Sequence, residues 1–239
     1  MPANFLNLPA ELRNEIYMYL LVDREPIDPW NGDGLVPNLL STNTKILHEA
    51  RSLLYGDNCF DFTEWRSELI SRFLDDIGFV NASHIRYIRI DFPELRGLND
   101  KASLGVDSLD ILERIQCHCT NLNKAIITSE STDAMEYRLD SYDSPNICAK
   151  AFALVYAHFR EISSPQDIVV EVYEEGPSSD IRKKMKSHGW TLNVVEEPVE
   201  EVEWNSHTSW DDFEDDECLR DYDDEFDDDD YDIDNDSDF

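Results

Sequence analysis

The stretch FLNLPAELRNEIYMYLL, from Phe5 to Leu21, is the part of the sequence around which the rest is organised. It predicts a short amphipathic helix, because Pro9 suits a first helical position, where its missing N–H costs nothing. Glu11 places a carboxylate in the first turn, at the positive end of the helix dipole. Apolar residues at helical spacing form one stripe, made of Leu12, Ile16, Tyr19 and Leu20. The remaining surface is expected to hold Glu11, Arg13, Asn14, Glu15 and Met18.

A helix of this length is marginally stable by itself, so its apolar stripe has to be buried. Two partners are open: the rest of this chain, or another protein. The function of the N-terminal region depends on which of the two covers the stripe.

Two segments of the sequence resemble a known family. The pattern LPAELRNEIYMYLL resembles the opening helix of the F-box, a module that docks onto the Skp adaptor of cullin-type ubiquitin ligases. The segment from Leu39 to Phe62, LLSTNTKILHEARSLLYGDNCFDF, is similar to a group of fungal F-box-like proteins. In that group a later His-Glu-Ala-Arg…Leu-Tyr segment follows the first helix. The resemblance covers roughly the first quarter of the chain.

The resemblance implies a protein-protein interaction protein and not an enzyme. It would be a possible substrate receptor, with a Skp-type adaptor and a cullin ligase as partners and a client protein still to be identified. The residues that the resemblance assigns to adaptor docking are Leu8, Pro9, Leu12, Ile16 and Leu20. Degenerate leucine-rich-repeat-like sheets are common behind F-boxes, so strand-helix repeats would fit the same family.

Beyond Gly56 the sequence alternates apolar strand patterns with amphipathic helices. Strands are expected over 58–62, 85–92, 124–128, 168–173 and 191–195. Helices are expected over 65–77, 109–119, 144–159 and 179–187. This alternation favours parallel pairing through right-handed crossovers. The predicted fold class is therefore mixed α+β or α/β, with a helical F-box-like module and a small, mostly parallel sheet covered by helices mainly on one face.

The charge distribution separates a tail from the body of the chain. Of the net charge of −33, residues 196–239 carry −22, from 23 acidic residues and one basic residue, Arg220. Like charges repel and little apolar area can be buried, so this segment is expected to be disordered. The predicted organisation is a helical module over residues 1–57, a strand-helix repeat region over 58–196 and a disordered acidic tail over 197–239.

The tail supports an alternative function. Its aromatic residues recur every few positions and would anchor a basic partner, such as a histone tail or a ribosomal segment, which the carboxylates would steer. A solvating extension without a partner stays open. The basic run from Arg182 to Lys186 also has two interpretations. It would grip phosphate or the acidic tail, or it would form an exposed helix face with Ile181 and Met185 turned inward.

Other functional classes find little support in the sequence. Cys117, His118 and Cys119 are consecutive and would point about 100° apart on a helix, so no metal or other cofactor is expected. No Gly-x-Ser-x-Gly, phosphate-binding loop or His-Glu-x-x-His motif is present. The strong negative charge would repel nucleic acid, and no apolar run approaches the ~20 residues of a membrane helix. Five cysteines in no framework spacing favour a reducing compartment, cytoplasmic or nuclear.

Overall fold

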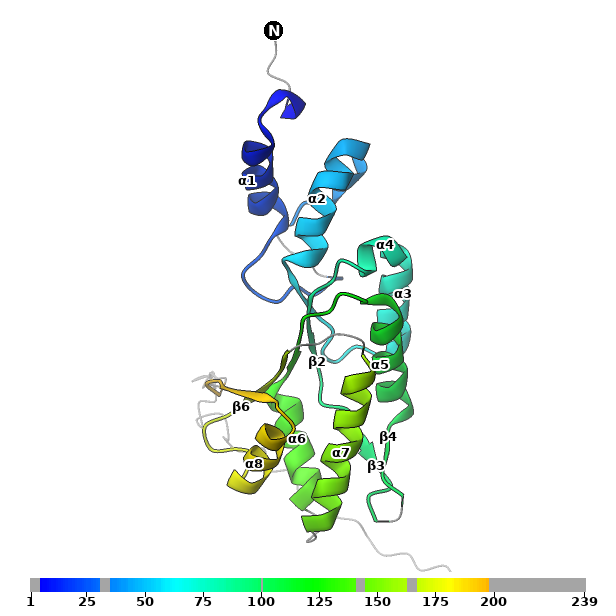
Figure 1. The fold of residues 1–239 in the computed structure, drawn as a ribbon, viewed down its shortest axis with the longest axis vertical. Helices are drawn as coiled ribbons and strands as arrows, with labels where there is room; N and C mark the ends of the chain where they lie inside the picture. The colour runs from blue at the N-terminus through cyan, green and yellow to red at the C-terminus, as the bar shows by residue number, and fades with distance from the viewer. Residues whose placement is uncertain (1–4, 31–34, 100, 141–144, 163–166, 198–239) are drawn as a thin grey trace, which may run out of the picture. The chain divides into compact units, whose positions relative to one another are not determined.

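The computed structural model describes residues 5–30, 35–99, 101–140, 145–162 and 167–197. All of them belong to one compact unit (Figure 1). The predicted acidic tail lies, from residue 198 onward, outside the described residues, and its disorder stays a prediction. The boundary expected at residue 57 also stays a prediction. Among the described residues, no helix combines the length and the apolar character that crossing a bilayer requires.

A five-stranded parallel sheet forms the centre of this unit. Its strands lie side by side in sequence order, and every neighbouring pair is parallel, which confirms the predicted sheet. The strands are β1 (Cys59–Asp61), β2 (Tyr87–Ile90), β5 (Lys124–Ile127), β6 (Asp167–Val172) and β7 (Thr191–Val194). A separate antiparallel pair joins β3 (Leu95–Arg96) to β4 (Ser103–Leu104).

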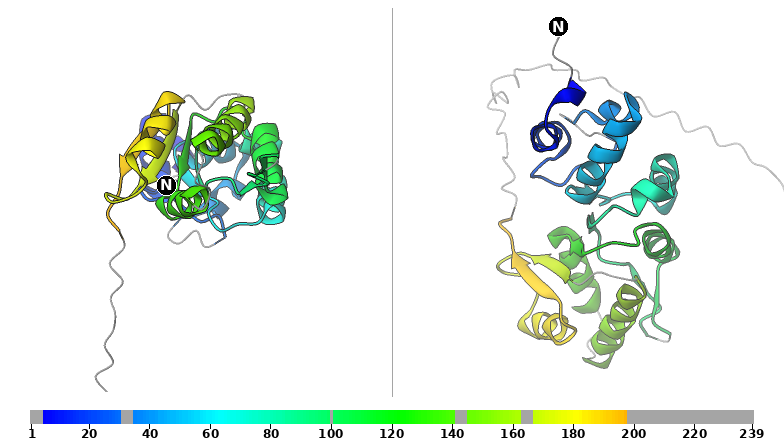
Figure 2. Two further views of the ribbon diagram at one scale, coloured as in Figure 1. Left: turned by 90° about the horizontal axis from the view of Figure 1, so that it is seen from below. Right: turned by 45° about the horizontal axis from the view of Figure 1, so that its top comes forward.

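A row of helices accompanies the sheet. Parallel strands that follow one another in order need crossovers of the same hand, which place their helices on the same face. The crossover helices are α3 (Ser67–Ile77), α5 (Val106–His118), α7 (Pro145–Glu161) and α8 (Ser179–Ser187). Helix α3 packs against α5, α5 against α7, and α7 against α8, as the views in Figures 1 and 2 show. All four helices lie where the sequence predicts them, within a few residues.

The main hydrophobic core lies between the helix row and the sheet. Strand residues at alternate positions point into it, and Ile88, Ile127 and Val170 are fully buried. Leu74 of α3, Ile115 of α5 and Phe152 of α7 meet them in one apolar cluster. Burying a side chain of this size stabilises the fold by about 1.5–3 kcal/mol. The alternate positions on the strands are more mixed: Arg89 and Glu171 are polar and half-buried, whereas Val169 is apolar and buried.

The N-terminal helices form a second, smaller cluster. Helix α1 (Ala10–Leu21) packs against α2 (Thr44–Gly56), and short 3-10 turns, η1 (Phe5–Asn7) and η2 (Pro37–Ser41), precede each of them. The buried residues of this cluster are Tyr17, Leu21, Leu40, Ile46, Ala50 and Leu54. The Asn43 side chain caps the start of α2, because it accepts a hydrogen bond from the Lys45 N–H at 2.8 Å.

Two contacts tie the N-terminal helices to the sheet. The buried Asn58 amide donates to the carbonyls of Leu21 and Leu54, at 2.6 and 2.7 Å, and so joins the carboxyl ends of α1 and α2. The loop between these helices also reaches the sheet, because Ile27 pairs with Phe60 of β1 in a parallel bridge. None of the strands expected from the sequence includes Ile27, so the structure adds this bridge to the predicted sheet.

Helix α6 (Ser129–Asp140) and the short helix α4 (Phe79–Ala82) are not predicted from the sequence. The sequence of α6, SESTDAMEYRLD, is mostly polar, and two of its four buried residues are Ser129 and Thr132. Because the buried side is only half apolar, the segment lacks a clear hydrophobic stripe. The hairpin of β3 and β4 is also not predicted, because each strand has only two residues.

Candidate functional site

Helix α1 presents to solvent the stripe that the sequence predicts to be buried. Its buried residues are Arg13, Tyr17 and Leu21. Leu12 is 46% exposed, Ile16 38% and Tyr19 88%. The prediction that Arg13 belongs to the outer surface is therefore wrong, and the buried face is displaced from the predicted stripe by one residue. The described part of this chain covers Leu12 and Ile16 only in part and leaves Tyr19 almost fully exposed.

An ion pair between α1 and α2 explains this orientation. The Arg13 guanidinium donates from Nε to Glu49 Oε2 at 2.8 Å and from Nη2 to Glu49 Oε1 at 2.6 Å. The same side chain also donates to the Leu8 carbonyl. The Tyr17 hydroxyl donates to Glu49 Oε2 at 3.1 Å. A bidentate pair of this kind fixes both the distance and the angle between its partners.

The electrostatics of this network favour its charged form. Hydrogen bonding to the Arg13 guanidinium lowers the pKa of the Glu49 carboxyl below its ordinary value of 4.5. Burial raises the pKa of the Tyr17 hydroxyl, and its hydrogen bond to the Glu49 carboxylate raises it further. Glu49 therefore stays ionised near neutral pH and holds α1 in one rotation against α2.

The five predicted docking residues are not equally accessible. Leu12 and Ile16 lie one turn apart on the exposed face, and Pro9 is exposed just before the helix begins. Leu8 is half-buried beside the Arg13 guanidinium. Leu20 is half-buried and packs against the N-terminal cluster. The exposed centre of the stripe therefore consists of Leu12 and Ile16, together with Tyr19, which belongs to the predicted stripe but not to the predicted docking residues.

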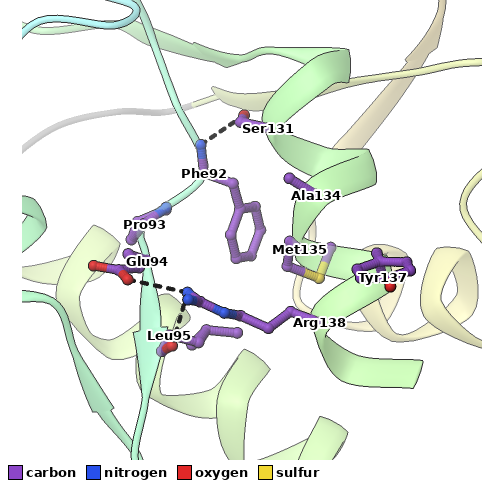
Figure 3. A pocket seen from close by; sticks show the side chains of 9 residues that line it. All are labelled: Phe92, Pro93, Glu94, Leu95, Ser131, Ala134, Met135, Tyr137 and Arg138. Atoms are coloured by element: carbon purple, nitrogen blue, oxygen red, sulfur yellow. Dashed lines mark hydrogen bonds and ion pairs between the residues drawn. The ribbon is translucent and has the colours of Figure 1, made fainter. Parts of the chain in front are cut away.

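A pocket of about 480 Å³ lies between α6 and the segment after β2. Phe92, Leu95 and Met135 form its buried apolar floor. At its rim, Arg138 Nη1 donates to Glu94 Oε1 and to the Leu95 carbonyl, both at 3.2 Å, as Figure 3 shows. The pocket offers mainly apolar surface beside one ion pair, which suits an apolar side chain. Sequence periodicity does not reveal this pocket, because half of it belongs to α6.

A network of three charged side chains lies on the polar side of the sheet. Arg89 of β2 donates to Asp61 Oδ2 of β1 at 3.1 Å and to Glu171 Oε2 of β6 at 3.0 Å. The Arg89 side chain is 25% exposed. Its two carboxylate partners account for its charge, so the group is best understood as a link between strands.

The residues of the basic run on α8 differ in their surroundings. Arg182 Nη2 donates to the carbonyls of Tyr173 and Gly176, at 2.6 and 2.7 Å, so its guanidinium stabilises the loop before the helix. Ile181 and Met185 are buried, which confirms that they turn inward. Lys183 and Lys186 remain on the exposed face.

Cysteine and metal chemistry have little support in the described segments. Cys117 is exposed, whereas Cys119 is buried and its burial raises its pKa to about 12. Within those segments, no group of three His, Cys, Asp or Glu side chains is placed to hold a metal ion.

Comparison of the chain with protein-family models, with curated proteins and with solved structures finds no match. A function for this chain therefore has to be inferred from its residues and their geometry.

Proposed function

We propose that this protein is an F-box-like interaction protein whose helix α1 docks on a Skp-type adaptor of a cullin ubiquitin ligase. The observation that carries the proposal is the exposed apolar stripe of Leu12, Ile16 and Tyr19. Contiguous exposed apolar side chains on a folded helix mark interaction surfaces. In this role the sheet region would select the client protein, which the adaptor brings to the ligase.

The spacing of the stripe supports this mode of binding. Its residues stand at positions i, i+4 and i+7, which is the pattern of a helix that lies in an apolar groove of its partner. A segment that becomes helical only on binding would lose conformational entropy in that step, whereas α1 is already ordered. The Arg13–Glu49 pair holds its first half, and Asn58 holds its last carbonyl. A preorganised helix loses less entropy when it docks.

The pocket beside α6 supports a client-binding role for the second region. Its apolar floor would accept one apolar side chain of the client, and the Arg138–Glu94 pair would bound the site. This assignment is secondary to the adaptor proposal. It predicts that filling the pocket with Ala134→Trp reduces client capture without changing adaptor binding.

The adaptor proposal is tested by co-purification with a recombinant Skp-type adaptor. The test variant is Leu12→Asp combined with Ile16→Asp, which places charge on the stripe without touching the buried face. The matched control is Leu69→Asp on α3, because Leu69 is also an exposed helical leucine, at 41%. Wild type and the control are expected to retain the adaptor, and the double variant is expected to lose it.

Two results would contradict the adaptor proposal: no binding by wild type, or undiminished binding by the double variant. Replacing Leu8 and Pro9 by Ala is a less specific test. Leu8 is half-buried, so shortening its side chain also removes packing at the start of the helix.

A second proposal rests on the sequence of the acidic tail. Residues 196–239 carry a net charge of −22 and regularly spaced aromatic residues, so the tail would bind basic partners such as histones or ribosomal segments. The test is titration of histones into the full chain and into a chain that ends at Glu196. Equal affinity of the two would contradict this proposal and leave the adaptor proposal untouched.

A further inference from the structure

The two edges of the sheet differ in what pairs with them. At one edge, Ile27 extends the sheet beyond β1, with its N–H donating to the Cys59 carbonyl at 2.8 Å and its carbonyl accepting from Asp61 N–H at 2.9 Å. At the other edge lies β7, drawn in orange in Figures 1 and 2. No strand follows β7 in the sheet, as far as the structure describes the chain. The sheet therefore has one open edge.

The register of β7 shows which backbone groups face this edge. Alternate residues of a strand direct their N–H and C=O groups to opposite sides. The Val195 N–H donates to the Val172 carbonyl at 2.9 Å, and Asn193 pairs with Glu171 of β6. Odd-numbered residues therefore bond to β6. The N–H and C=O groups of Leu192 and Val194 face away from β6, towards the open edge.

The strand at this edge is short, but its sequence, TLNV, contains neither a proline nor a charged residue. Proline and charged side chains are among the features that keep an edge strand from pairing. Val194 is 57% exposed at its carboxyl end. An uncharged strand with outward backbone donors and acceptors is a template for another extended segment.

The surroundings of β7 indicate the charge of that segment. A depression of about 540 Å³ at the carboxyl end of the strand is lined by Glu174, Glu175, Val194, Val195, Glu196 and Glu197. Four carboxylates thus surround two apolar side chains, without a basic residue in the lining. A second copy of this chain would bring two such acidic groups together, each on a chain of net charge −33. A basic segment would be attracted instead.

We propose that β7 binds an extended basic segment of a partner protein, which adds to the open edge of the sheet. Backbone hydrogen bonds to Leu192 and Val194 would hold the segment, and its Lys or Arg side chains would lie beside the four glutamates. This interaction is independent of adaptor docking by α1. Both can occur on one chain, and either can fail alone.

The first experiment separates strand pairing from simple charge attraction. Two fluorescein-labelled peptides are titrated into the full chain: the valine peptide Lys-Val-Lys-Val-Lys-Val-Lys, and a copy of it in which every backbone nitrogen is methylated. Both carry the same charge, but the methylated copy has no backbone N–H donor in either register. We expect the valine peptide to bind about tenfold more tightly, from the backbone bonds that only it can form. Equal affinity, or no binding, would overturn the proposal.

The second experiment locates the binding at the edge. Val194→Pro removes an N–H that β6 does not use, so the sheet keeps its hydrogen bonds. Val194→Thr is the matched control, since it retains the N–H at the same position. We expect the valine peptide to lose about tenfold in affinity for the proline variant and less than about threefold for the threonine variant. Equal losses, with both variants folded by circular dichroism, would overturn the assignment to β7.

Amide hydrogen exchange provides a direct readout that needs no variant. The valine peptide is expected to slow exchange at Leu192 and Val194 and to leave Asn193 unchanged, because Asn193 already bonds to β6. Unchanged exchange at Leu192 and Val194 would overturn the proposal.

Sedimentation tests whether a second copy of this chain occupies the edge instead. A wild-type dimer that Val194→Pro dissociates would show that a second copy takes this edge, and it would likewise overturn the proposal.

Discussion

The contact between α1 and α2 and the core beneath the sheet are built from different interactions. Between the helices, Arg13, Tyr17 and Glu49 form a hydrogen-bonded network beside a small apolar cluster. Beneath the sheet, the core is a continuous set of apolar side chains around Ile88 and Phe152. Apolar burial is non-directional, whereas a bidentate ion pair fixes orientation.

This difference teaches how the molecule assigns its surfaces. We interpret the core as the main source of stability and the network as the device that sets the rotation of α1. Arg13 and Tyr17 lie on the buried face of α1, and Leu12 and Ile16 lie on the exposed face. Turning Leu12 and Ile16 inward would separate the Arg13 guanidinium from the half-buried Glu49 carboxylate and break the two hydrogen bonds between them. Four predictions test this comparison.

The largest effect is expected in the apolar core. Phe152 is 1% exposed and its ring contacts Phe92 and Trp190 at edge-to-face geometry. Phe152→Ala is expected to reduce the free energy of unfolding by about 3–5 kcal/mol, from lost burial and the cavity left behind. Urea denaturation measures this. Tyr137→Ala, at an 84% exposed position, is the control and is expected to change the free energy by less than about 0.5 kcal/mol.

The next effect is a loss of stability in acid that depends on Glu49. The folded-state pKa of Glu49 is lower than its ordinary value of 4.5, so the unfolded chain takes up the proton first as the pH falls. The stabilisation is complete above pH 4.5 and disappears as the pH falls through the folded-state pKa. Glu49→Gln is expected to be less stable than wild type at neutral pH. The difference in free energy of unfolding between the two proteins is expected to become smaller in acid. A gap independent of pH would contradict the role of the ion pair.

A smaller effect is expected from the tyrosine hydroxyl. Tyr17→Phe removes the hydrogen bond to Glu49 and leaves the ring in place, so the expected loss is about 1–3 kcal/mol. Tyr19→Phe is a matched control on the same helix, because Tyr19 is 88% exposed. Thermal unfolding of the two variants compares the stability contributed by a hydroxyl on the buried face of α1 with that of one on its exposed face. Equal destabilisation would show that the orientation of α1 is assigned incorrectly.

The smallest effect on stability is expected at the exposed stripe. Leu12→Ala is expected to change the free energy of unfolding by less than about 0.5 kcal/mol. Leu21→Ala, on the buried face of the same helix, is expected to cost about 2–5 kcal/mol. Denaturant unfolding of this pair compares one residue type on two faces. A large loss for Leu12→Ala would mean that the stripe packs against this chain, and it would remove the basis of the adaptor proposal.

Local signals in the sequence predict most of the elements. Asn43 caps α2, and Gly78, with a positive φ of 76°, ends α3. The alternation of Ile88 and Ile90 marks β2. These signals succeed because caps, turns and periodic apolar positions depend on neighbours within a few residues. Helix α6 escapes prediction, since its position depends on packing beside β6 and the segment after β2 more than on its own apolar pattern.

The sequence by itself determined the positions of most strands and helices along the chain, the parallel pairing of the main sheet and the existence of an amphipathic helix at the N-terminus. Only the tertiary structure decided which face of that helix is covered. The physical reason is that Glu49, which draws Arg13 inward, stands 36 residues away along the chain. The open edge at β7 was decided in the same way, because the place of a strand within the sheet depends on contacts between distant segments and not on the four residues of the strand.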